Sequence, residues 1–160
     1  MTKVALALFL VVLVPAVGLA QRSDEQKSQG YAFFAPGVAA PGSISTVQFG
    51  VGGEGLVYKG GGVGGELGYV APSQSFGGGL GVLSANGSYN FSRRKKLVPF
   101  VTGGYTLLFR AGSANGVNFG GGINYWLRKR VGLRLEFRDQ IFPALDGKNF
   151  LGFRIGLSFR

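Results

Sequence analysis

Large apolar side chains recur at every second position through most of the chain, which is the period of a β-strand. The clearest stretch is 131–138, where the odd positions are apolar and the even ones hold Gly132, Arg134, Glu136 and Arg138. The C-terminus repeats the pattern with Leu151, Phe153, Ile155, Leu157 and Phe159. Helical spacing of apolar residues is missing after residue 20, so the pattern predicts an all-β fold.

Turn residues divide this pattern into eight strands. The predicted ranges are 30–39, 45–58, 61–71, 78–91, 97–110, 116–128, 131–142 and 149–160. Glycine dominates the polar face, whereas a soluble β-sandwich would show charged and hydroxyl side chains there. An eight-stranded barrel has an interior just wide enough for side chains to fill, so a crowded inner face suits it. We therefore expect a closed eight-stranded antiparallel up-and-down transmembrane β-barrel with its apolar face in lipid.

The spacing of glycines and charges predicts a register for one hairpin. If the turn is centred on Lys129, Gly122 lies across from Glu136 and Gly120 across from Arg138. Each large inward charge then has a glycine beside it, which gives it room in a narrow lumen. The alternative is that glycine-rich strands only tolerate bulges.

The same alternation assigns charged residues of both signs to the lumen. They are Glu54, Glu66 and Glu136 against Arg134, Arg138 and Arg154. Unpaired charge in a poorly hydrated interior is costly, so an equal number of each sign favours a lumen network of ion pairs. Wet, loosely paired side chains are the alternative.

The first twenty residues have the three parts of a secretory signal. Lys3 is a short positive region, 4–14 is an unbroken apolar run, and Gly18 and Ala20 are small residues at a cleavage site. The run is about half the roughly 20 residues that a membrane helix needs. We expect a cleaved signal over 1–20, a disordered lead-in over 21–29 and the barrel over 30–160.

Composition narrows the chemistry further. The chain of 160 residues contains 30 glycines but only 6 prolines, with no G-X-Y period, so it is not collagen. It contains no cysteine and no histidine, which excludes disulfides, Cys/His metal sites and imidazole catalysis. We expect no catalytic, cofactor-binding or metal site. The net charge of +10 would suit a nucleic-acid partner, but an export signal argues against one.

Basic residues outside the strands fall in alternate connections. Lys59, 93–96 and 128–130 belong to the second, fourth and sixth connections, which share one end of an up-and-down barrel. Export of the N-terminus makes this the periplasmic end. The opposite connections are 36–45, 73–78, 111–116 and 143–149. The basic rim could attract phosphate headgroups or an acidic partner, or it could simply be solvated turns.

Aromatic residues gather near the predicted strand ends, as in the interfacial girdles of outer-membrane barrels. They are Tyr31, Phe33, Phe34, Tyr58, Tyr69, Tyr89, Phe91, Phe109, Tyr125, Trp126, Phe142 and Phe159.

The signal, the eight alternating strands and the segments 99–105, 118–126 and 132–138 resemble the small outer-membrane β-barrel domain proteins, similar in architecture to the OmpA and OmpX barrels. The resemblance implies that the barrel-assembly machinery reads the last strand through Phe153, Ile155, Leu157 and Phe159. This chain departs from the pattern because Arg160 follows the terminal aromatic.

These features predict a monomeric, non-enzymatic outer-membrane barrel with a structural or envelope-integrity role, surrounded by outer-membrane lipid. Similar barrels that act on lipid A acyl chains rely on a histidine, which this chain lacks. A lipid- or lipopolysaccharide-interacting barrel, a minor pore and a secreted soluble β-sandwich that binds a ligand are the alternatives. A filled lumen argues against a pore, and short external loops argue against an adhesin.

Overall fold

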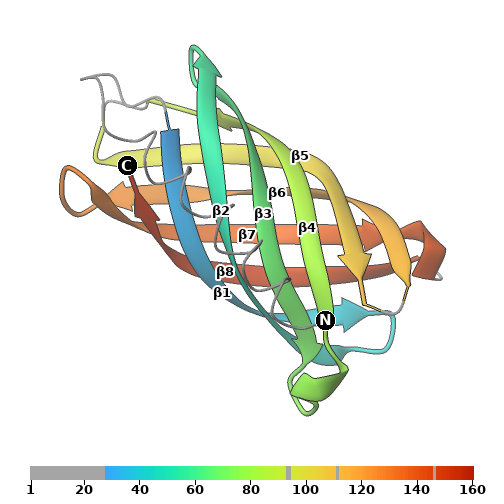
Figure 1. Cartoon of the computed structure of the whole chain (residues 1–160). Helices are drawn as coiled ribbons and strands as arrows, with labels where there is room; N and C mark the ends of the chain where they lie inside the picture. The colour runs from blue at the N-terminus through green and yellow to red at the C-terminus, as the bar shows by residue number, and fades with distance from the viewer. Residues whose placement is uncertain (1–27, 93–94, 111, 146) are drawn as a thin grey trace, which may run out of the picture.

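The computed structural model describes residues 28–92, 95–110, 112–145 and 147–160. These residues form one closed barrel of eight antiparallel strands, each hydrogen-bonded to its neighbours in the sequence (Figure 1). The strands are β1 (Ser28–Ala40), β2 (Ile44–Tyr58), β3 (Gly61–Pro72), β4 (Leu80–Asn90), β5 (Leu97–Phe109), β6 (Ser113–Trp126), β7 (Val131–Phe142) and β8 (Lys148–Phe159). Two single-turn 3₁₀ helices follow β3 and β7, namely η2 (Phe76–Gly78) and η3 (Pro143–Leu145). In the described ranges, neither helix is long and apolar enough to cross a membrane.

Pairing between the first and last strands closes the barrel and leaves no free sheet edge. Phe34 lies opposite Ile155, and Gly30 lies opposite Phe159. The predicted fold class is therefore confirmed, and the alternative of a two-sheet sandwich is wrong.

The strand boundaries follow the predicted ranges closely, with three informative differences. β1 begins at Ser28, so Ser28 and Gln29 belong to the barrel and not to the predicted lead-in. β1 and β2 continue to the pair Ala39 and Ile44, and β5 and β6 continue to the pair Phe109 and Ser113. The connections at this end are consequently shorter than the predicted 36–45 and 111–116. The predicted signal over 1–20 and the part of the predicted lead-in over 21–27 lie outside the described residues.

The hairpin register confirms the prediction of a turn centred on Lys129. Gly122 is the partner of Glu136, and Gly120 is the partner of Arg138. The C-terminus lies beside this turn, at the left of Figure 1, while the β7–β8 connection lies at the opposite end. We call the end with the β2–β3, β4–β5 and β6–β7 connections the turn end, and the other the loop end.

Burial alternates along every strand, which separates an inner face from an outer one. In β7, Arg134, Glu136 and Arg138 are buried while Phe137 is 51% exposed. Large apolar side chains are exposed on all eight strands, from Phe34 on β1 to Phe159 on β8. A soluble monomer rarely exposes a continuous apolar surface of this extent, so the outer wall is built to face an apolar medium.

Candidate functional site

Four charged side chains from three strands meet near the middle of the lumen. Glu66 on β3 forms ion pairs with Arg138 on β7 (Nη2–Oε1, 3.1 Å) and with Arg154 on β8 (Nη1–Oε2, 2.9 Å). Glu136, on the same face of β7, pairs with Arg138, and its Oε1 lies 3.8 Å from Nη1 of Arg154. These side chains are at most 3% exposed, so each charge depends on its partners and not on water.

Arg134 joins the cluster from the turn end of β7. Its Nε lies 3.0 Å from Oε2 of Glu136. Its guanidinium also lies between two aromatic rings, 4.2 Å from the centre of Tyr31 and 3.9 Å from the centre of Phe100. Arg154 stacks in the same way on Phe33, at 4.2 Å. Guanidinium groups that lack water gain from the negative faces of such rings.

Neutral polar side chains extend the cluster to the strands on the other side of the lumen. The Tyr31 hydroxyl donates to Oε1 of Glu66 (2.7 Å), and Nη1 of Arg138 donates to Oδ1 of Asn118 (2.7 Å). The Asn118 amide donates in turn to Asn86 (2.9 Å) and Thr106 (2.7 Å). The hydrogen-bonded network therefore joins β1, β3, β4, β5, β6, β7 and β8 through their inner faces.

Glu54 lies apart from this cluster, contrary to the predicted six-residue network. Its carboxylate accepts a 2.6 Å hydrogen bond from Nδ2 of Asn90 on β4. Among the residues that the structure describes, Glu54 takes part in no ion pair, although it is buried. The inner cluster thus consists of Glu66, Arg134, Glu136, Arg138 and Arg154, three guanidiniums against two carboxylates, with Glu54 held by an amide.

Glycines give these large side chains their room. A Cβ on Gly122 would lie 2.7 Å from Cα of Glu136, and one on Gly120 would lie 3.1 Å from Nε of Arg138. Gly52 is covered by the Tyr31 ring, where a Cβ would lie 2.6 Å from Cζ. Added side chains would collide with backbone or with the packed ring, so the crowding interpretation of these glycines is supported over mere tolerance of bulges.

The loop end of the lumen is closed by apolar side chains, which the sequence analysis did not identify. Their buried members are Val70, Val82, Leu108, Ala114 and Phe142, with Leu80, Leu145 and Phe150 packed against them. Phe142 and Phe150 meet edge to face with centroids 5.6 Å apart. The lumen is therefore charged at its centre and apolar toward one end.

The predicted aromatic girdle is wrong for four of its members. Tyr31, Phe33, Trp126 and Phe142 are buried in the lumen, with at most 7% exposure. Every second residue of a strand faces the same side, and Tyr31 and Phe33 lie in the same series as Gln29 and Ala35, which are buried too. The alternation of this strand could therefore have shown that the two aromatic side chains face the lumen. The remaining predicted members are exposed or half-buried on the outer wall.

The last strand presents the predicted assembly residues on the outer wall. Phe153, Ile155, Leu157 and Phe159 are each 45–48% exposed. Arg160 stacks on Trp126 at 3.9 Å, and its Nε donates to the carbonyl oxygen of Lys129 (3.0 Å). Recognition of this strand by assembly machinery stays a prediction.

Comparison with known proteins identifies the fold. No protein-family model matches the chain, and no curated protein matches it in sequence. Among solved structures, Neisserial surface protein A is 13% identical with a TM-score of 0.66, covering 82% of this chain and 94% of that one. The N-terminal β-barrel domain of Pseudomonas aeruginosa OprF is 15% identical (TM-score 0.63; 82% and 96% covered). The attachment invasion locus protein Ail of Yersinia pestis is 11% identical (TM-score 0.57; 82% and 96% covered). At these identities the likeness shows the fold and not the activity.

Proposed function

We propose that this chain is a non-enzymatic outer-membrane protein whose barrel has a structural, envelope-integrity role. The apolar outer wall around a charged, self-paired lumen carries the proposal, because only a membrane barrel gains from this inside-out arrangement. The fold shared with outer-membrane proteins and the predicted export signal support the same location.

The interior supports a structural role over transport or catalysis. Arg138 and Arg154 cross the lumen to Glu66, so side chains occupy the path along the barrel axis. The absence of histidine from the sequence removes the general base on which lipid-modifying barrels of this size depend. The barrel is accordingly proposed to be a closed, rigid element of the membrane.

Cell fractionation combined with gel mobility tests the proposal. The protein should sediment with the outer membrane, need detergent for extraction, and migrate differently before and after boiling, because a folded barrel binds less detergent than its unfolded chain. Release into the soluble fraction without detergent would overturn it. Turnover of phospholipid by the purified, folded barrel would overturn the non-enzymatic part alone.

Orientation is tested with single cysteines, since the native chain has none. Ser113→Cys, at the loop end, should react in intact cells with a membrane-impermeant thiol reagent. Lys95→Cys, at the turn end, should react only after permeabilisation. Labelling of Lys95→Cys alone in intact cells would mean that the turn end faces outward.

A further inference from the structure

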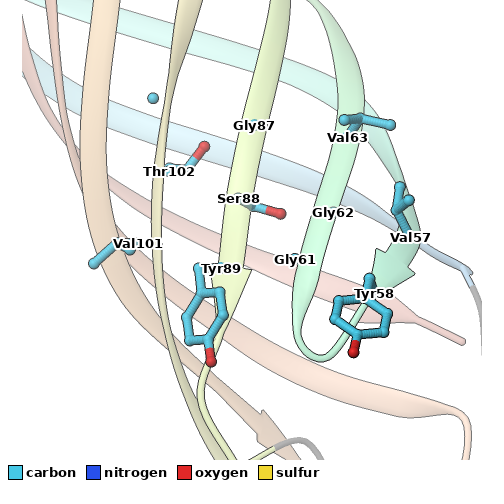
Figure 2. A pocket seen from close by; sticks show the side chains of 11 residues that line it. Val57, Tyr58, Gly61, Gly62, Val63, Gly87, Ser88, Tyr89, Val101 and Thr102 are labelled. Atoms are coloured by element: carbon cyan, nitrogen blue, oxygen red, sulfur yellow. The ribbon is translucent and has the colours of Figure 1, made fainter.

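A groove of about 540 Å³ runs along the outer wall at the turn end, across β2, β3, β4 and β5. Its volume falls in the roughly 300–1,000 Å³ range of small-ligand sites. Tyr58 and Tyr89 project from neighbouring parts of its wall, with their hydroxyls toward the β2–β3 turn (Figure 2). The groove is open along its length, so its contents would come from the medium that surrounds the barrel.

The groove exists because outward positions on its floor are glycines. Gly87 on β4 pairs with Gly103 on β5 and with Val63 on β3, while Gly61 pairs with Tyr89. The walls are exposed apolar side chains, with Val63 at 61% and Val101 at 49% exposure. A Cβ on Gly87 would meet only a carbonyl oxygen of Gly103, at 3.8 Å. The packing of the barrel therefore does not require glycine at this position, and the space above it belongs to the groove.

The mouth of the groove is basic. The β2–β3 turn carries Lys59, whose Nζ lies 5.0 Å from the centre of the Tyr58 ring. This turn is fixed against the groove wall, because the backbone N–H of Asn90 donates to the carbonyl oxygen of Gly60 (2.8 Å). Lys95 and Lys96 are exposed in the connection between β4 and β5, beyond the same end of the groove.

Acidic side chains do not offset this charge in the part of the chain that the structure describes. Glu54, Glu66 and Glu136 are buried in the lumen, and Asp139 lies near the loop end of β7. The turn end is therefore a cationic rim above an apolar groove. Such a surface is complementary to a molecule with an anionic head and an apolar tail.

We propose that this groove binds one anionic phospholipid of the leaflet at the turn end, with an acyl chain over Gly87 and Gly103 and its phosphate at Lys59. The proposal rests on the membrane location proposed above. Tyr58 and Tyr89 stand at the turn end of the groove, where this pose puts the glycerol and phosphate, and tyrosines are typical of that interfacial depth. Juxtamembrane basic residues gain about 1 kcal/mol each at an anionic surface, which favours phosphatidylglycerol over zwitterionic lipids.

Native mass spectrometry of the purified mature chain in detergent tests this site with two lipid probes. Phosphatidylglycerol should be retained one to one, in preference to phosphatidylcholine with the same acyl chains. Lys59→Gln should weaken that retention about fivefold, the factor that corresponds to about 1 kcal/mol for one basic residue at an anionic surface. Gly87→Leu should weaken it about tenfold, because the added side chain displaces a length of acyl chain from apolar contact.

Gly30→Leu is the matched control. Gly30 faces outward on β1 at the same end but outside the groove, and a Cβ there would meet only the Gly52 carbonyl oxygen at 3.7 Å. Retention by this variant should equal that of the wild type.

Each contrary result separates the proposal from its rivals. Equal retention of both lipids, or equal effects of Gly30→Leu and Gly87→Leu, would mean non-specific annular lipid. Loss with Lys59→Gln but not with Gly87→Leu, together with competition by inorganic phosphate, would mean a phosphate site without a groove. A two-chain species abolished by Gly87→Leu would assign the groove to a second copy. A barrel that inserts into vesicles yet retains no lipid would overturn this inference and leave the proposed function standing.

Discussion

Replacing Glu66 with glutamine should strongly destabilise the barrel. The substitution keeps the shape of the side chain but removes the negative charge that faces Arg138 at 3.1 Å and Arg154 at 2.9 Å. The inner cluster then holds three guanidiniums against one carboxylate, so its net charge rises from +1 to +2. Removing one partner from a buried ion pair costs about 3–5 kcal/mol, and we expect a loss of that size in the free energy of unfolding.

The double variant Glu66→Gln/Arg154→Met should recover part of the loss. Methionine keeps an apolar contact with the Phe33 ring on which Arg154 stacks, and the charge of the cluster returns to +1. The cycle of single and double variants should give a coupling energy of roughly 0.5–3 kcal/mol. Urea unfolding in phospholipid vesicles measures it, with fluorescence from Trp126, the only tryptophan of the sequence and a buried one.

Glu54→Gln supplies the control for this cycle. Glu54 is buried as deeply, but its hydrogen-bond partner is the Asn90 amide, to which a glutamine oxygen can still bind. We expect a loss of about 1.5–3 kcal/mol at most, with no recovery on adding Arg154→Met. The ion pairs do not stabilise the barrel if the free energy of unfolding of Glu66→Gln lies within about 0.5 kcal/mol of the wild-type value. The same conclusion follows if the losses caused by Glu66→Gln and Arg154→Met add up, within the same margin, to the loss in the double variant.

Two further substitutions test the walls. Leu135→Arg places a charge on the outer face of β7, between Ile123 and Ile155, and should cost about 2–4 kcal/mol in vesicle unfolding if the site lies near the bilayer midplane; stability equal to that of the wild type would mean that this face is not in lipid. Gly122→Leu should abolish the change of gel mobility on boiling that marks a folded barrel, because its Cβ would lie 2.7 Å from the Glu136 backbone. Gly87→Leu should keep that change, because its Cβ has room. A folded Gly122→Leu barrel would refute the crowding argument.

The sequence was sufficient for the strands, and for the inner and outer faces of those strands whose charged residues mark the lumen side. Because side chains alternate between the two faces of a strand, one residue of known orientation assigns the orientation of the whole strand. In β7 the charged residues of 131–138 mark the inner face. The short β6–β7 turn then fixes the register, so the sequence alone predicts the partners of Gly120 and Gly122. Local spacing is enough for these features because they depend on hydrogen-bonded neighbours.

Contacts across the lumen could not be predicted in the same way. Arg138 on β7 meets Glu66 on β3, four strands away, and this meeting depends on the tilt and stagger of the whole barrel. The strand alternation, with three inward charges of each sign, predicted that Glu54 would join the ion-pair network, yet Glu54 lies beside Asn90. The first strand was misleading for another reason: Phe33 and Phe34 are adjacent aromatics on opposite faces, so neither alone shows which side faces lipid.

The distribution of charge connects the lumen to the proposed lipid site. Inside the barrel, three guanidiniums pair with two carboxylates at short range, because water is excluded from the lumen. Glu66 and Glu136 pair there, and Glu54 is buried beside Asn90, so no glutamate of the described residues lies on the surface beside the exposed lysines of the turn end. Lipid phosphates are anions of a bilayer surface, and a cationic rim next to an apolar groove suits those that carry acyl chains.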